Sequence, residues 1–366
     1  MDMCFDFLEW LGPDTSTSVL MILDDPADLV RLSAVSRSWR RFVISNGFCK
    51  KLCLRMCLEV SYFENVIEAS TPRESSEVGS STAMEWASLE KEHRAYSYLS
   101  YYLTSSSGNQ DCISESICAS STDNYPVESI ENTLIESDRV DMRPSYWSSK
   151  GERDPVVPET LTYRLDSKLC IINEIKVKPF EAYFQPGSPI YSAKAVRFRM
   201  GHSRSPHVTE TDATDNNVAQ GTPNENYVWT YVSPSFPMVQ ENCLQSFKLP
   251  RPVICIGGIV QIELLGRVQV QEVDGLYYVC VCHVQVIGLP LAPIFDANIL
   301  GDQCAVLKFL PPREGTSSKV GIPPSVSLPE RGSDMKARSG WNHRTLPLLY
   351  TFLRVSESDS DEDFFA

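Results

Sequence analysis

The chain has 366 residues, a formal net charge of −14 and an ordinary apolar content of 42%. This length predicts about two domains, and the apolar content lets them bury a sizeable core. The negative charge argues against a general nucleic-acid-binding protein, which needs a basic face. No stretch of the sequence is long and apolar enough to span a bilayer, so we expect neither nucleic acid nor membrane as a partner.

The twelve cysteines are scattered along the chain, and the first six residues lack the basic leader of a signal peptide. We therefore expect reduced thiols in a cytoplasmic and/or nuclear protein. Cys49, Cys53 and Cys57 follow one another at steps of four residues, but a zinc site needs a fourth ligand and tighter clustering. Because leucines and methionine surround them, we predict buried small residues there and no metal site.

The N-terminal region is expected to form two or three short helices. Four apolar residues recur at steps of three, three and four: Leu29, Leu32, Val35 and Trp39. This spacing predicts one apolar stripe on a single helix. Pro26 follows two aspartates that can cap that helix, and the apolar patch Val19–Leu23 precedes them. Helices this short bury little surface alone, so they need a partner or a neighbouring domain.

The order of these features resembles an F-box, the helical hook that ties a protein to a Skp-family adaptor and so to a cullin–RING ubiquitin ligase. Pro-x-Asp-Leu at residues 26–29 and Val-Ser-x-x-Trp-Arg at residues 35–40 carry the resemblance. The first half departs from the family, because Asp14–Thr17 stands where typical F-boxes have a carboxylate and two leucines. The alternative is an ordinary helical hairpin of a larger core. The resemblance implies these adaptor-binding residues: Pro13, Leu20, Ile22, Leu23, Pro26, Leu29, Val35 and Trp39.

Beyond the helical unit, the composition and predicted secondary structure of the chain change twice. We expect the helical unit to cover residues 1–63 and a linker to cover 64–111, with one amphipathic helix at about 82–103. From residue 112, strand-like segments alternate with turn residues, and Asp274-Gly275 is the strongest hairpin signal. The fold class is therefore α+β multidomain: a small all-α unit, then an all-β jelly-roll-like sandwich over 112–292. Residues 293–366 are expected to be a largely flexible tail with an acidic end.

The motif order within 112–292 resembles galactose-binding-like, discoidin-type sandwiches. Ser120-Ser121 and Trp147-Ser148-Ser149 resemble the opening of that family, and Ile262–Gly266 resembles its closing strand. A different β-sandwich is the main alternative. The whole layout, an F-box followed by a single sandwich, resembles plant F-box proteins.

No catalytic motif is visible: the sequence has neither a phosphate-binding loop nor a Gly-x-Ser-x-Gly elbow. We expect no enzyme and no cofactor, but the substrate-recognition subunit of a Skp–cullin–F-box ubiquitin ligase whose sandwich holds an unknown protein target, glycosylated or not. Aromatic residues near predicted turns are the candidates for target binding: Tyr146, Phe184 and Tyr227. The alternative function is a carbohydrate- or protein-binding scaffold without a ligase role.

Overall fold

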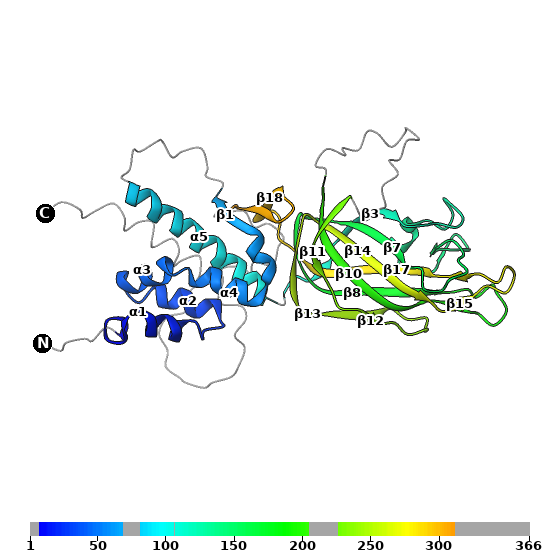
Figure 1. Ribbon diagram of the computed structural model, residues 1–366, viewed down its shortest axis with the longest axis horizontal. Helices are drawn as coiled ribbons and strands as arrows, with labels where there is room; N and C mark the ends of the chain where they lie inside the picture. The colour runs from blue at the N-terminus through cyan, green and yellow to red at the C-terminus, as the bar shows by residue number, and fades with distance from the viewer. Residues whose placement is uncertain (1–6, 69–80, 106, 205–225, 312–366) are drawn as a thin grey trace, which may run out of the picture. The chain divides into compact units, whose positions relative to one another are not determined.

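The computed structural model describes residues 7–68, 81–105, 107–204 and 226–311 (Figure 1). Within these ranges the chain forms two compact units. Residues 7–56 and 81–108 belong to a helical unit, and residues 57–68 and 109–310 belong to a β unit.

The helical unit is built from five helices. They are α1 (Phe7–Leu20), α2 (Pro26–Ser33), α3 (Arg37–Ser45), α4 (Phe48–Met56) and α5 (Ser81–Thr104). The helices α2, α3 and α4 all pack against α5, so the long fifth helix organises the unit. None of the helices in the described ranges is long and apolar enough to cross a membrane.

The start of α2 is as the sequence predicts, but its end is not. The side chain of Asp25 accepts the N–H of Ala27 at 2.8 Å, and Pro26 takes the first helical position. The prediction of one helix through Trp39 is wrong, because α2 ends at Ser33. The Oγ of Ser36 then accepts the N–H of Trp39 at 3.2 Å and caps a new helix, α3. The stripe is therefore divided between two helices and the turn that joins them.

The helix expected within the linker is a core element of the helical unit. Its residues Tyr96 and Leu99 are fully buried, and α4 supplies the thiols that face it. Cys49 Sγ lies 3.2 Å from Ser97 Oγ, and Cys53 donates to the carbonyl of Tyr96 at 3.4 Å. Burial raises the pKa of Cys49 to about 11. These cysteines are packing residues, and the described residues hold no group of side chains suited to a metal.

The β unit contains a sandwich of two sheets, and all strand pairs within these two sheets are antiparallel. The first sheet has the order β11 (Tyr227–Val232), β10 (Ala193–Ser203), β14 (Ile259–Arg267), β7 (Glu159–Leu165) and β3 (Ile113–Ala119), with β12 (Phe236–Pro237) beside β10. The second has the order β13 (Gln245–Ile256), β8 (Leu169–Glu181), β17 (Cys280–Pro290) and β2 (Gln110–Asp111), with β6 (Trp147–Ser148) and β9 (Ile190–Tyr191) at its sides. The predicted β-sandwich is confirmed.

The core of the sandwich follows the alternation of the sequence. Val196, Phe198 and Met200 of β10 are fully buried between the sheets, while the arginines between them point to the outer face. Trp147 is fully buried as well, and its Nε1 donates to the carbonyl of Ser121 at 3.0 Å. The serine pair and the Trp-Ser-Ser turn of the sequence thus meet at one end of the sandwich.

The structure places the unit boundaries differently from the sequence-based division. A three-stranded sheet joins β1 (Phe63–Glu68) to β19 (Cys304–Phe309) in parallel, and β18 (Phe295–Gly301) pairs with β19. Residues 293–310, predicted as tail, and residues 64–68, predicted as linker, therefore contribute to this sheet. Pairing between segments so distant in sequence leaves no local signal. The predicted flexible segment beyond residue 311, with its acidic end, lies outside the described residues.

Candidate binding sites

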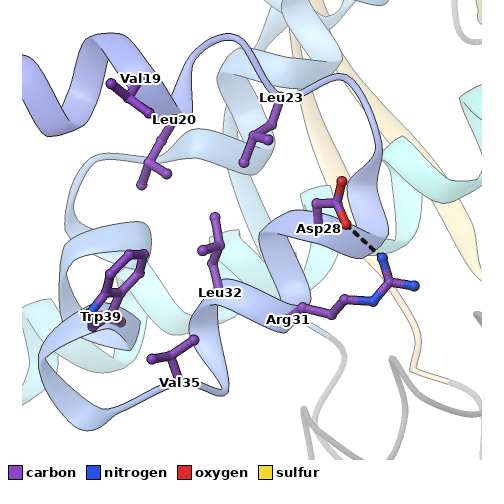
Figure 2. Close-up of a pocket in the computed structure, with 8 residues that line it drawn as sticks. All are labelled: Val19, Leu20, Leu23, Asp28, Arg31, Leu32, Val35 and Trp39. Atoms are coloured by element: carbon purple, nitrogen blue, oxygen red, sulfur yellow. Dashed lines mark hydrogen bonds and ion pairs between the residues drawn. The ribbon is translucent and has the colours of Figure 1, made fainter. Parts of the chain in front are cut away.

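An apolar groove with a volume of about 350 Å³ opens among α1, α2 and α3 (Figure 2). The side chains of Leu20, Leu23 and Leu32 point toward one another across it, and Trp39 lies on its far side. Arg55 of α4 donates to the carbonyls of Met21 and Leu23, and so fixes the turn after α1 that carries Leu23. The groove is lined by Val19, Leu20, Leu23, Asp28, Arg31, Leu32, Val35 and Trp39.

Asp28 and Arg31 supply the charged side chains of the lining. Arg31 Nη1 lies 2.6 Å from Asp28 Oδ1 along α2, and both side chains are nearly half exposed. An exposed pair of this kind contributes little to folding. Its place at the edge of an apolar groove gives that groove a charged rim.

A cluster of stacked aromatic rings lies at one end of the sandwich. Tyr146 stacks on Phe180 with ring centroids 3.9 Å apart and planes 10° apart. Tyr183 and Phe184 lie in the β8–β9 loop, each with its ring centroid 6.2 Å from that of Phe180. Phe184 is 51% exposed, whereas Phe180 is buried. The cluster therefore offers one exposed ring supported by one buried ring and two partly buried ones.

Two tyrosine hydroxyl groups at this end of the sandwich are already bonded within the protein. Tyr146 donates to Glu128 Oε1 at 2.6 Å, and burial together with Glu128 raises the pKa of Tyr146. Tyr191 donates to Gln185 at 2.7 Å, in the same loop as Phe184. The guanidinium of Arg139 stacks on Tyr183 at 3.9 Å from the ring centroid. The surface of this end is consequently more apolar than its tyrosine content suggests.

Arg267 holds the loops of this end together. Its side chain is 1% exposed, and its Nη2 donates to Glu159 Oε1 at 2.5 Å. Its Nη1 also reaches Ser149 Oγ at 3.0 Å and the carbonyls of Lys150 and Tyr277 at 2.7 and 3.0 Å. One buried guanidinium therefore fixes three loop segments that surround the aromatic cluster.

Comparison with known proteins identifies the helical unit. The F-box-like family matches residues 13–55, a range that contains every residue lining the groove. An F-box protein of Arabidopsis thaliana is 52% identical over 301 residues, which cover 81% of this chain and 80% of that protein.

This chain belongs to the F-box protein family. The sandwich of this F-box protein is also similar to solved carbohydrate-binding modules. One is a family 32 module from C. perfringens NanJ solved with galactose, at 12% identity and a TM-score of 0.30, covering 49% of this chain and 99% of that one. Another is a chitosan-binding module from a Paenibacillus enzyme, with the same identity and TM-score, covering 48% and 98%. These values carry no argument about what the F-box protein binds.

The structure of the F-box protein brings four of the predicted adaptor-binding residues to the groove. Leu23 and Trp39 line it while partly exposed, and Val35 lines it with 61% of its surface exposed. Leu20 also lines the groove, although only 5% of it is exposed. Val19, Asp28, Arg31 and Leu32 were not among the predicted residues, although the i,i+3 pairing of Asp28 with Arg31 was a usable sequence signal.

The other predicted adaptor-binding residues of the F-box protein lie elsewhere. Pro26 and Leu29 are buried, with Leu29 only 1% exposed. Within this chain both side chains pack in the bundle and stabilise it, and their contact with an adaptor stays a prediction. Pro13 and Ile22 are exposed, but neither lines the groove.

The predicted target-binding residues do not form one site. Tyr146 and Phe184 share the aromatic cluster at the loop end, whereas Tyr227 pairs with Ser203 at the far end of β10. β10 starts next to β9 and has 11 residues, so Tyr227 lies roughly 30 Å from the aromatic cluster at about 3.3 Å per residue. Tyr227 belongs instead to the outer face of the first sheet.

Proposed function

We propose that this F-box protein is the substrate-recognition subunit of a Skp–cullin–F-box ubiquitin ligase. The groove among α1, α2 and α3 binds the Skp-family adaptor, and the sandwich holds the protein target. The subunit performs no chemistry and needs no cofactor, since ubiquitin transfer belongs to other subunits. It works in the cytoplasm and/or the nucleus.

The observation that carries this proposal is the open apolar groove within the range that matches the F-box-like family. Val35 is 61% exposed at the groove, beside Leu23, Leu32 and Trp39. Small helical units seldom leave apolar side chains together at the surface unless a partner covers them. The charged rim formed by Asp28 and Arg31 is typical of an interface that is apolar at its centre and polar at its edge.

The target side of the proposal rests on the loop end of the sandwich. Phe184 is exposed there above the buried ring of Phe180, and Tyr146 packs on that same ring. An aromatic side chain on a rigid support is the kind of anchor that dominates protein interfaces. Phe184 is therefore proposed as a contact to the target, with Tyr146 as its support.

A capture assay with a purified Skp-family adaptor tests the adaptor side. Val35→Asp in the full chain should reduce capture at least about tenfold, because it introduces a charge into the groove. Met84→Asp is the matched control, since Met84 is 67% exposed on α5 and far from the lining in sequence. Equal capture of the two variants would contradict the proposal.

The exposed aromatic ring of Phe184 also favours a second candidate function, a carbohydrate- or protein-binding scaffold without a ligase role. In that case wild-type protein would fail to capture the adaptor, and Val35→Asp would change nothing. A glycan array with the full chain, compared with the Phe184→Ala variant, tests the carbohydrate part of this alternative. Binding that needs Phe184, without adaptor capture, would support the scaffold.

A further inference from the structure

The loops at the loop end of the sandwich rest on a small hydrophobic cluster of their own. Its buried aromatic members are Phe180, Tyr191 and Tyr278, and Tyr146 and Tyr183 pack against it. This cluster is separate from the main core between the two sheets. The loops above it therefore have a packed support, as loops that carry binding residues usually do.

A tight hairpin of β4 (Arg139–Val140) and β5 (Arg143–Pro144) presents a methionine at its tip. The two turn residues, Asp141 and Met142, have φ angles of 50° and 64°. A turn with positive φ at both positions favours asparagine followed by glycine, because a side chain is strained there. Met142 occupies the glycine position all the same, and it is 90% exposed. A side chain that neither suits the turn nor packs on the protein points to a binding role.

A second hairpin at this end presents an exposed valine. It consists of β15 (Gln269–Val270) and β16 (Tyr277–Tyr278), and Val273 in its loop is 91% exposed (Figure 1). Tyr278 belongs to the buried cluster and donates its hydroxyl to Asp274 at 2.7 Å. This bond ties the loop that carries Val273 to the cluster beneath it.

Three exposed apolar side chains, Met142, Phe184 and Val273, thus come from loops that share one support. Arg139, at the base of the first hairpin, stacks on Tyr183, and the ring of Tyr183 lies 5.6 Å from that of Phe184. Other exposed apolar side chains on the loops of this end are Tyr125 and Val156. Apolar side chains gathered at one end of a domain mark a surface that a partner covers.

The same loops are acidic. Eleven aspartates and glutamates but only four arginines and lysines lie in the loop segments 121–157, 182–190, 239–244 and 268–277. Their net charge of −7 is half that of the whole chain. Carboxylates flank the apolar side chains directly, since Asp141 precedes Met142, and Glu272 and Asp274 stand on either side of Val273. The charge of a partner that covers this surface must therefore be positive.

A basic segment of a protein, with apolar side chains among its lysines and arginines, matches these groups. Its cations would pair with the exposed carboxylates of Asp141 and Glu272, and its apolar side chains would contact Met142, Phe184 and Val273. A second copy of this chain, with its charge of −14, would bring like charges together. The acidic segment 356–363 of the chain itself does not fit for the same reason.

We infer that the loop end of the sandwich binds a basic segment of the target protein that also carries apolar side chains. That the partner is the target rests on the proposed function, whereas its chemistry follows from the loop end. Phe184, proposed above as a contact to the target, is one of three apolar anchors, and Met142 and Val273 are the other two. The carboxylates beside these anchors select for positive charge.

Fluorescence anisotropy with the full chain tests the inference. The probe is a short fluorescein-labelled peptide of alternating lysine and phenylalanine. One control peptide has glutamine in place of lysine, and the other has alanine in place of phenylalanine. Saturable binding of the probe, about tenfold tighter than that of either control peptide and weakened by salt, is the expected result. Binding of either control peptide as tight as that of the probe, or no binding of the probe, would overturn the inference.

Matched variants locate the apolar contact. Met142→Ala should bind the probe about fivefold more weakly. Leu300→Ala truncates an exposed apolar side chain of β18, in the three-stranded sheet, and should leave probe binding unchanged. Met142→Gly gives the turn its favoured residue, so it should lose the same affinity with no fall in the urea midpoint of unfolding. Equal affinities of Met142→Ala and Leu300→Ala for the probe would overturn the assignment to the loop end.

A second matched pair locates the charge. Asp141→Asn should bind the probe about threefold more weakly, and asparagine tolerates the positive φ of this position. Asp166→Asn makes the same change at an exposed position of the β7–β8 turn, and should leave binding unchanged. The seven residues of β7 separate that turn from the loop end by about 23 Å, well beyond the Debye length of about 8 Å at physiological salt. Equal affinities of these two variants would likewise overturn the inference.

Adaptor capture, measured in parallel on the same proteins, separates the peptide site from the proposed function. Met142→Ala and Asp141→Asn should leave capture unchanged, because both residues belong to the β unit. A wild type that captures the adaptor but does not bind the probe would contradict the peptide site alone. Probe binding that depends on Met142 and Asp141, in a protein that captures no adaptor, would support the peptide site and contradict the proposed ligase role.

Discussion

The two units of this protein differ in how completely they bury apolar side chains and pair charged ones. The helical unit leaves Val35 largely exposed and Leu23 partly exposed at an open groove. The β unit encloses Arg267 and Glu159 as a buried ion pair, and Arg267 also donates to Ser149, Lys150 and Tyr277. Because the helical unit leaves apolar surface unburied, it can bind a partner there. Because the β unit pairs its buried charges, its loops are held in place.

In helix α2, residues that pack in the core are direct neighbours of residues that line the groove. Leu29 and Val30 are buried, whereas Asp28, Arg31 and Leu32 line the groove. A helix repeats every 3.6 residues, so one short helix can present both faces. Stability and partner binding are therefore separable by choosing positions on the same helix.

The largest effect is expected for Arg267→Met, which removes the cation and leaves Glu159 buried without it. The sandwich should lose about 3–5 kcal/mol, because an uncompensated buried charge is strongly destabilising. Urea unfolding followed by tryptophan fluorescence measures this, since Trp147 is fully buried in the sandwich. The double variant Arg267→Met with Glu159→Leu should recover much of the loss. Equal stability of the single and double variants would contradict the role assigned to the pair.

Leu29→Ala should destabilise the helical unit by about 2–5 kcal/mol, because it opens a cavity at a side chain that is 1% exposed. Val35→Ala, at 61% exposure, should change its stability by less than about 0.5 kcal/mol. Thermal unfolding followed by the helical circular dichroism signal compares the two. Similar losses of stability in the two variants would show that Val35 is packed in the core. That result would contradict the contrast between an open helical unit and a closed β unit.

His93 of α5 should make the helical unit sensitive to acid. Burial, followed by the charges of Arg40 and Arg94, lowers its pKa from 6.5 to about 4. The unfolded chain therefore binds a proton between these values that the folded chain does not, so the stabilisation is complete above pH 6.5 and is lost as the pH falls toward 4. Between pH 7 and pH 5 the expected loss is about 2 kcal/mol.

Unfolding of the wild type and of His93→Gln at the two pH values measures this contribution. The variant lacks the titrating group, so its stability should fall less than that of the wild type by about the same amount. A wild type and a variant that lose equal stability on acidification would show that other groups are responsible.

The sequence predicted local features well and long-range pairing poorly. The start of α2 at Pro26 and the hairpin at Asp274-Gly275 are both confirmed, because each depends on neighbouring residues. Phe180, the centre of the aromatic cluster, lies near the end of β8 and was not among the predicted target-binding residues.

The candidate sites show the same division. Arg197 and Arg199 share the carboxylate of Glu263, which comes from a strand 66 residues beyond Arg197, so no local sequence pattern indicates this contact. In the helical unit, the spacing of apolar residues indicated the right region but predicted one helix where the structure has two. Periodicity reports which residues share a face, but it does not report whether a cap interrupts the helix between them.

Ser36 provides the last test, with the smallest expected effect. Ser36→Ala removes the oxygen that accepts the N–H of Trp39, and should reduce the stability of the helical unit by about 1 kcal/mol. Ser38→Ala is the matched control, because Ser38 is exposed inside α3 and alanine favours a helix interior. If Ser36 also sets the direction in which Trp39 meets the groove, Ser36→Ala should weaken adaptor capture while Ser38→Ala should not. A destabilised Ser36→Ala protein with unchanged capture at a temperature where both variants are folded would show that the cap serves the helix alone.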